Sequence, residues 1–122
     1  MRIIGSIEEL NNLLQRETIL LTYFGNKSCS VCHATKPKVE ALLKEFPGVL
    51  SCYCPADRIP QLAGQHLVFA VPAVILFFQG KEVFRSARFI DLDRMVDRLK
   101  ELSDHVEISY GSSNNNGNNG QR

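Results

Sequence analysis

The stretch TILLTYFGNKSCSVC, residues 18–32, decides how the rest of the chain is interpreted. Its first seven residues are apolar, aromatic or β-branched, a pattern typical of a buried strand. A short polar loop follows, and a helical pattern begins at Cys29 or Ser30. Cys29 and Cys32 are therefore predicted on the first turn of a helix, close enough to bond, where the positive end of the helix dipole favours a thiolate. This arrangement suits thiol–disulfide exchange.

The composition is that of an ordinary globular domain. The chain has 122 residues, of which 44% are hydrophobic and 22% charged, and its formal net charge of +1 gives no reason to expect nucleic acid as a partner. No apolar run approaches about 20 residues, so we expect no membrane span. The N-terminal segment has neither a long apolar core nor a small-residue cleavage site, so we expect a cytoplasmic protein. A close cysteine pair there is more often catalytic, redox-sensing or metal-binding than structural.

Hydrophobic periodicity and turn residues divide the chain into alternating helices and strands. The predicted helices span residues 6–16, 29–46, 57–64 and a last segment from the cap at Asp91 to about Leu102, and the predicted strands span residues 18–24, 49–54, 73–78 and 83–86. A strand–helix–strand unit favours parallel pairing, and the final hairpin adds antiparallel strands. The predicted fold is α/β, with a central mixed sheet of four to five strands and helices on both faces.

The C-terminal residues differ in composition from the rest of the chain. Asn, Gly and Ser dominate residues 111–122, with almost no apolar side chains to fix them in place. We therefore expect one domain over residues 1–104, followed by a flexible tail over residues 105–122.

Four features together resemble the thioredoxin family, over roughly Ile3 to Leu102. The features are the Cys29-Ser30-Val31-Cys32 motif after a buried strand, Pro37 five residues beyond the motif, Val71-Pro72 ahead of an apolar strand, and the segment Phe77-Phe78-Gln79-Gly80-Lys81 ahead of the last strand. A CxxC motif is a weak signal by itself, but its combination with the two prolines and the order of elements is specific.

The resemblance implies a thioredoxin fold and a thiol–disulfide oxidoreductase that reduces protein disulfides. In this interpretation Cys29 is the exposed nucleophile and Cys32 is the buried resolving thiol. The family pattern also implies a cis Val71–Pro72 peptide that faces the cysteines and, with Ser28, binds the substrate chain. The implied partners are disulfide-containing protein clients and an external reductase such as a thioredoxin reductase, because the chain has no glycine-rich phosphate loop to hold a cofactor.

Several positions depart from the family pattern. Ser28 stands where the family usually has Trp, Ser30-Val31 replaces the frequent Gly-Pro, and the segment after the last strand is the bulky Arg88-Phe89-Ile90. Tyr23 stands where many members bury an acidic residue thought to help the resolving thiol lose its proton, and a phenol is a poor base at neutral pH. These departures leave a second hypothesis open, in which the domain is a binding, adaptor or redox-sensing module with little turnover.

Haem attachment and zinc binding are the alternative roles for these cysteines. Residues 29–33, which end in His33, literally match the c-type haem signature, but that attachment normally requires export and a haem pocket. Cys52 and Cys54 bring the thiols to four, enough for tetrahedral zinc, yet a Cys-X-Cys pair within a strand lacks the knuckle loops of structural zinc sites. We therefore expect no metal and no cofactor, with His33 on the helix surface and Cys52 and Cys54 in the core.

Overall fold

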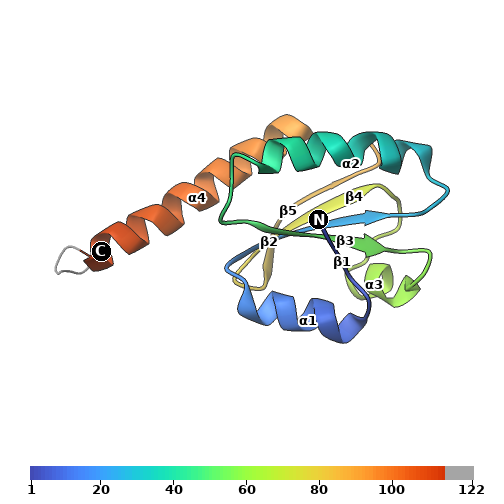
Figure 1. Cartoon of the computed structure of the whole chain (residues 1–122), viewed down its shortest axis with the longest axis horizontal. Coiled ribbons are helices and arrows are strands. Elements are labelled where there is room, and N and C mark those ends of the chain that lie inside the picture. The colour runs from blue at the N-terminus through green and yellow to red at the C-terminus, as the bar shows by residue number, and fades with distance from the viewer. Residues whose placement is uncertain (115–122) are drawn as a thin grey trace. The chain divides into compact units, whose positions relative to one another are not determined.

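The computed structural model describes residues 1–114, with side chains described through residue 106. Its elements follow one another as β1 (Arg2–Ile3), α1 (Ile7–Arg16), β2 (Ile19–Gly25), α2 (Ser30–Leu43), β3 (Leu50–Pro55), α3 (Pro60–Gln65), β4 (Ala73–Phe78), β5 (Lys81–Ala87) and α4 (Leu92–Asn114). Figure 1 shows the chain with these labels. The order confirms the predicted alternation and adds β1, which sequence analysis missed because two residues carry no periodic pattern.

The five strands form one mixed sheet in the order β1-β3-β2-β4-β5. β1 and β2 run parallel to β3, whereas β4 runs antiparallel to both β2 and β5. β2 is thus the central strand, and all seven of its residues are buried. Burial on both faces explains why β2 shows a continuous apolar run instead of an alternating one. The predicted mixed sheet of four to five strands is confirmed.

Helices cover both faces of this sheet. α1 and α3 lie on one face, and α2 lies on the opposite face (Figure 1). On the first face, side chains from the helices and strands pack into one apolar cluster. Its members include Leu10 and Leu13 of α1, Leu62 of α3, and Cys52 and Cys54 of β3. This arrangement confirms the predicted α/β fold and places the β3 cysteines on the side away from α2.

Several element boundaries differ from the predicted ones. α3 begins at Pro60 and not at residue 57, because proline fits the first helical turn, where its missing N–H would have no partner. α2 ends at Leu43, and residues 44–46 continue as a tighter turn ahead of Pro47, with backbone N–H groups bonded three residues back. α4 continues to Asn114, past the boundary predicted at residue 104. The division into a domain and a tail stays a prediction, and residues 115–122 lie outside the described residues.

The first compact unit of the chain, Met1–Leu92, contains the sheet and the helices α1 to α3. It also holds every residue of the candidate site described below. None of the helices in the described part of the chain combines the length and the apolar character that crossing a membrane requires.

Gly80 lies in the turn between β4 and β5. Its φ is +81°, and a Cβ added there would lie 3.1 Å from the backbone oxygen of Leu14. We expect Gly80→Ala to lower the free energy of unfolding by about 1–2 kcal/mol, because alanine is strained in the left-handed region. Gly48→Ala is the control, since nothing lies within 4 Å of a Cβ there. Urea denaturation measures both variants, and equal stability of the two would contradict this account.

Candidate active site

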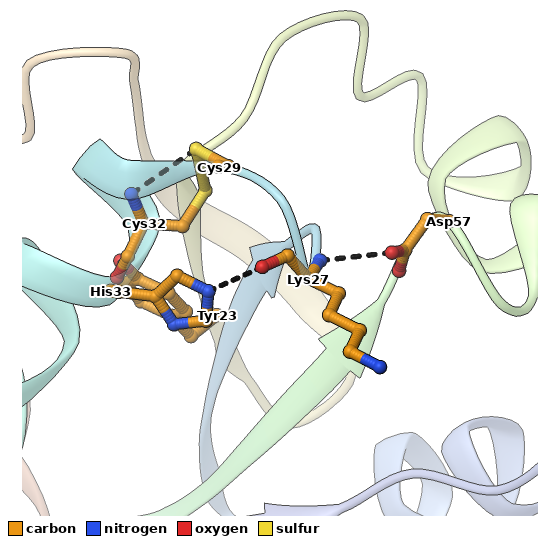
Figure 2. The surroundings of a disulfide bond; sticks show 6 residues. All are labelled: Tyr23, Lys27, Cys29, Cys32, His33 and Asp57. Carbon is orange, nitrogen blue, oxygen red and sulfur yellow. Dashed lines mark hydrogen bonds between the residues drawn. A yellow bond between two sulfur atoms is a disulfide. The ribbon is translucent and has the colours of Figure 1, made fainter.

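Two cysteines meet where β2 ends and α2 begins. Cys29 is the N-cap residue of α2, and Cys32 lies on its first turn. A disulfide joins the two residues, whose Cα atoms lie 5.3 Å apart, and Figure 2 shows this bond. Cys29 is half-buried, whereas Cys32 is only 2% exposed. The structure therefore brings the two predicted cysteines together and makes Cys29 the more accessible of the pair.

The amino end of α2 stabilises negative charge on the sulfur of Cys29. The backbone N–H of Cys32 donates to Cys29 Sγ, with a nitrogen-to-sulfur distance of 3.1 Å. The unpaired N–H groups of a first helical turn and the positive end of the helix dipole both favour an anion at this position. In the reduced protein, Cys29 is therefore the thiol better suited to react as a thiolate.

The backbone of Lys27 ties the loop before Cys29 to two neighbouring segments. The Lys27 N–H donates to Asp57 Oδ2 at 2.9 Å, and the Lys27 carbonyl is bonded to His33 Nε2 (Figure 2). The hydrogen bond from Lys27 is the main reason why the pKa of the Asp57 carboxyl lies below its ordinary value. Because a carbonyl can only accept, Nε2 of His33 carries the hydrogen. His33 is exposed on the helix, as predicted, and it links α2 to the loop.

Tyr23 lies beneath the first turn of α2. Its side chain is fully buried, and its hydroxyl donates to the carbonyl oxygen of Cys32 at 2.7 Å. Burial and, to a smaller extent, the neighbouring Tyr53 raise the pKa of Tyr23 to about 12. The two rings stack with their centroids 6.1 Å apart, and the residues are paired on the parallel strands β2 and β3. Tyr23 therefore acts as a hydrogen-bond donor at neutral pH and not as a base.

A cavity of about 360 Å³ opens beside Cys32. Its walls come from α2, from the loop before α2, and from β1 and the end of β3. Its charged or titratable side chains belong to Lys27, His33, Lys36, Tyr53, Asp57 and Arg58. Cationic side chains outnumber the one carboxylate, so the cavity wall favours negative charge near Cys32.

The predicted substrate-binding segment approaches the same edge of the sheet as the cysteines. Phe24, near the end of β2, pairs with Ala73 at the start of β4. Val71-Pro72 therefore leads into the sheet next to the point where β2 gives way to the loop that carries Cys29. The sheet register thus explains how segments about forty residues apart in sequence reach one edge.

The three predicted substrate-binding residues differ in exposure. Ser28 is exposed, Val71 is half-buried and Pro72 is buried. The Val71–Pro72 peptide bond is cis, and the carbonyl of Pro72 accepts a hydrogen bond from the Arg88 N–H at 2.7 Å. The binding role of Ser28, Val71 and Pro72 stays a prediction.

The second cysteine pair lies in the core on the other side of the sheet. Cys52 and Cys54 are free, fully buried thiols that pack with side chains of α1 and α3. A hydrogen bond with Cys52, together with burial, raises the pKa of Cys54. Within the described residues, no three His, Cys, Asp or Glu side chains gather in a way that could hold a metal ion. The sheet separates the four thiols that the zinc alternative requires together.

Sequence analysis missed the contact of Lys27 with Asp57, the pairing of Tyr23 with Tyr53, and the cavity. Part of the signal was available, because parallel alignment of the strands places Tyr53 beside Tyr23, and Asp57 follows at the same edge. The cavity has no comparable signal, since it depends on how side chains of α2 and the end of β3 fill the space between them.

A mixed α/β sheet whose central strand leads into a helix capped by one of two disulfide-bonded cysteines defines a thiol–disulfide oxidoreductase domain. Comparison with known proteins agrees with this class. The family profile described as Thioredoxin matches residues 5–101, and the chain belongs to the thioredoxin family.

Individual relatives and solved structures extend the comparison. Thioredoxin-like protein YdfQ of Bacillus subtilis is 31% identical over 97 residues, covering 80% of this chain and 87% of that protein. Thioredoxin of Chlamydia muridarum is 37% identical over 83 residues, covering 68% of this chain and 81% of that protein. The structure of Fasciola hepatica thioredoxin matches with a TM-score of 0.72 at 28% identity, covering 80% of this chain and 98% of that chain. Together with the Cys29–Cys32 pair, these matches identify an enzyme, a thiol–disulfide oxidoreductase.

Thioredoxin from Trypanosoma brucei brucei matches with a TM-score of 0.76 at 19% identity, covering 84% of this chain and 89% of that chain. At that identity the likeness shows the fold alone.

Asp57 makes the stability of the domain depend on pH. A carboxyl whose pKa is lower in the folded than in the unfolded chain stabilises the fold above its ordinary value of 3.8, and this contribution is lost as the pH falls through the lowered value. We therefore expect Asp57→Asn to be less stable than wild type at about pH 6 and the gap to shrink toward about pH 2. Urea denaturation across this range measures the gap. A gap that widens toward acid would contradict the role of Asp57.

Proposed function

We propose that this chain reduces disulfide bonds of protein clients, with Cys29 and Cys32 as the reacting dithiol. The observation that carries the proposal is the position of Cys29 at the N-cap of α2, with Cys32 within disulfide reach and almost fully buried. The accessible thiol of Cys29 is suited to attack a client disulfide. The buried thiol of Cys32 is suited to attack the sulfur of Cys29 once the mixed disulfide has formed.

The reaction takes place in two exchanges. The thiolate of Cys29 attacks one sulfur of the client disulfide, forming a mixed disulfide and releasing the other client sulfur, which takes up a proton. Cys32 then loses its proton and attacks Cys29 Sγ, which closes the Cys29–Cys32 disulfide and releases the second client thiolate. Two electrons pass from the dithiol to the client, so the enzyme ends oxidised.

The client chain binds beside Cys29, at Ser28, Val71 and Pro72. The main chain at Val71, which leads into β4, offers an extended segment to which a client strand can add through backbone hydrogen bonds. Ser28 is small and exposed, so it leaves room for the client next to the nucleophile. Val31, between the two cysteines, is 44% exposed and adds apolar surface at the same place.

An external reductase, such as a thioredoxin reductase, returns the disulfide to the dithiol state. This partner follows from the electron balance, because each client that is reduced leaves Cys29 and Cys32 oxidised. The proposed compartment is the cytoplasm, where thiols are kept reduced and a dithiol can act repeatedly as an electron donor.

Insulin reduction by dithiothreitol tests the proposed activity. We expect the wild-type chain to accelerate the precipitation of reduced insulin, and Cys29→Ser to lower the rate to the uncatalysed background because no nucleophilic sulfur remains at the N-cap. Cys54→Ala is the matched control, since it removes a cysteine from the other side of the sheet. Failure of the wild-type chain to accelerate the reaction would contradict the proposal.

A binding module with little turnover is the second candidate. The exposure of Phe89 favours a binding module, since its side chain is 87% exposed. Phe89 lies in the bulky segment after β5, next to Arg88, whose φ is +68°. Such a surface can hold a partner without exchange. The insulin assay distinguishes the two candidates, because a binding module leaves the rate at background for wild type and Cys29→Ser alike.

The Cys32→Ser variant isolates the first exchange. We expect it to accumulate a covalent complex with a disulfide-containing client, because serine cannot attack Cys29 Sγ to release the client. Non-reducing electrophoresis detects the complex, and treatment with dithiothreitol should separate its two chains by reducing the mixed disulfide. A complex that survives in the double variant Cys29→Ser with Cys32→Ser would show that neither cysteine carries the client.

A further inference from the structure

The second exchange requires Cys32 to lose a proton from a buried position. Cys32 is 2% exposed, and burial in apolar surroundings disfavours the thiolate over the thiol. A group that takes the proton would therefore decide how fast the mixed disulfide is resolved. The side chains near Cys32 that could take this proton belong to the sheet below it and to the cavity beside it.

The sheet below Cys32 supplies phenols. Tyr23 is fully buried, and its hydroxyl already donates to the carbonyl of Cys32 at 2.7 Å. Burial raises the pKa of Tyr23 to about 12 and also raises the pKa of the adjacent Tyr53. Both side chains keep their own protons near neutral pH, so neither takes the proton of Cys32.

The cavity wall supplies mostly cations. Lys27, Lys36 and Arg58 line it, and an ammonium or guanidinium group offers hydrogen-bond donors but no acceptor. Glu40, on the same helix as Lys36, is paired with the Lys36 ammonium and with the Met1 amine, each at 3.3 Å. The three cations stabilise negative charge near Cys32 and offer no proton acceptor, and the Glu40 carboxylate is not among the side chains that line the cavity.

Two lining residues in the described part of the chain can accept a proton, namely His33 and Asp57. Both are held by the backbone of Lys27. The hydrogen bond from the Lys27 N–H keeps the pKa of Asp57 low, so its carboxylate is a weak base. The Nε2 hydrogen of His33 is directed to the Lys27 carbonyl, which holds the ring at the loop (Figure 2), so only Nδ1 of this exposed ring is left to accept a proton. The cavity itself, of about 360 Å³, has room for water next to Cys32.

We propose that Tyr23 is a positioning residue that holds the first turn of α2 through the carbonyl of Cys32, and that Cys32 gives its proton to water in the cavity and not to a side chain. This inference rests on the proposed function. If Cys32 gives its proton to water, resolution of the mixed disulfide is the slower of the two exchanges near neutral pH, and the rate of resolution rises with pH. The chain therefore holds its clients covalently for longer at lower pH.

An aromatic disulfide, dithiobis(nitrobenzoate), separates the two exchanges. Cys29 thiolate attacks it, forms a mixed disulfide and releases one coloured nitrothiolate. Cys32 then passes its proton to water, its thiolate attacks Cys29 Sγ, and the second nitrothiolate leaves. Stopped-flow absorbance of the reduced chain therefore shows two phases, of which the second reports Cys32. Absence of both phases would remove the proposed function, whereas the pH dependence of the second phase tests only the present inference.

For the wild-type chain we expect the second phase to be slower than the first and to accelerate close to tenfold per pH unit between about pH 6 and about pH 8, because Cys32 loses its proton to water in an equilibrium that precedes the attack, and the thiolate fraction rises tenfold per unit while the thiol is mostly protonated. A second phase that is independent of pH, or that levels off near the ordinary pKa of histidine at about 6.5, would overturn the inference. This measurement needs no variant, so it stands whether or not substitutions at buried Tyr23 fold.

Three variants sharpen the test. Tyr23→Asp places a carboxylate under Cys32, and we expect it to speed the second phase at least about tenfold at about pH 7 and to flatten its pH dependence. Tyr23→Phe is the matched control, because it removes the hydrogen bond to the Cys32 carbonyl and adds no base. We expect Tyr23→Phe to change the rate of the second phase by the same factor at every pH. His33→Asn should keep the steep pH dependence, and its loss in that variant would identify His33 as the base and contradict the proposal.

Discussion

The junction between β2 and α2 is the constraint on which the rest of the structure depends. β2 pairs with both β3 and β4, so its end cannot shift without disturbing the sheet. It ends at Gly25, where an added Cβ would lie 3.0 Å from the Tyr53 ring and 3.4 Å from Cys32 Cβ. The missing side chain lets α2 approach the sheet closely. That approach puts Cys29 at the open end of the helix and buries Cys32, on the first turn, against the sheet.

The chemistry of the two sulfurs follows from this one geometry. The same N–H groups that begin α2 favour charge on Cys29, and the same close packing that seats α2 buries Cys32. The hydrogen bond from the Tyr23 hydroxyl to the Cys32 carbonyl also holds the first turn of α2 against the sheet. Activation of one thiol and shielding of the other are thus two results of a single helix position.

Much of the fold could be predicted from the sequence because its signals are local. The apolar run of β2, the turn residues and the spacing of Cys29 and Cys32 each depend on neighbouring residues. β1 could not be predicted, since its two residues form a strand only because β3 is there to pair with them. The bond between Lys27 and Asp57 joins segments 30 residues apart and depends on the parallel alignment of β2 and β3. The cavity depends on side-chain packing that no local pattern encodes.

Selective alkylation of the reduced chain tests most directly the claim that α2 activates Cys29 and shields Cys32. Brief treatment with iodoacetamide near pH 6.5, where an ordinary thiol with a pKa of about 8.5 is mostly protonated, is followed by mass spectrometry of the peptides. The account predicts modification of Cys29 at least about tenfold faster than modification of Cys32. Equal labelling of the two cysteines, or faster labelling of Cys32, would contradict it.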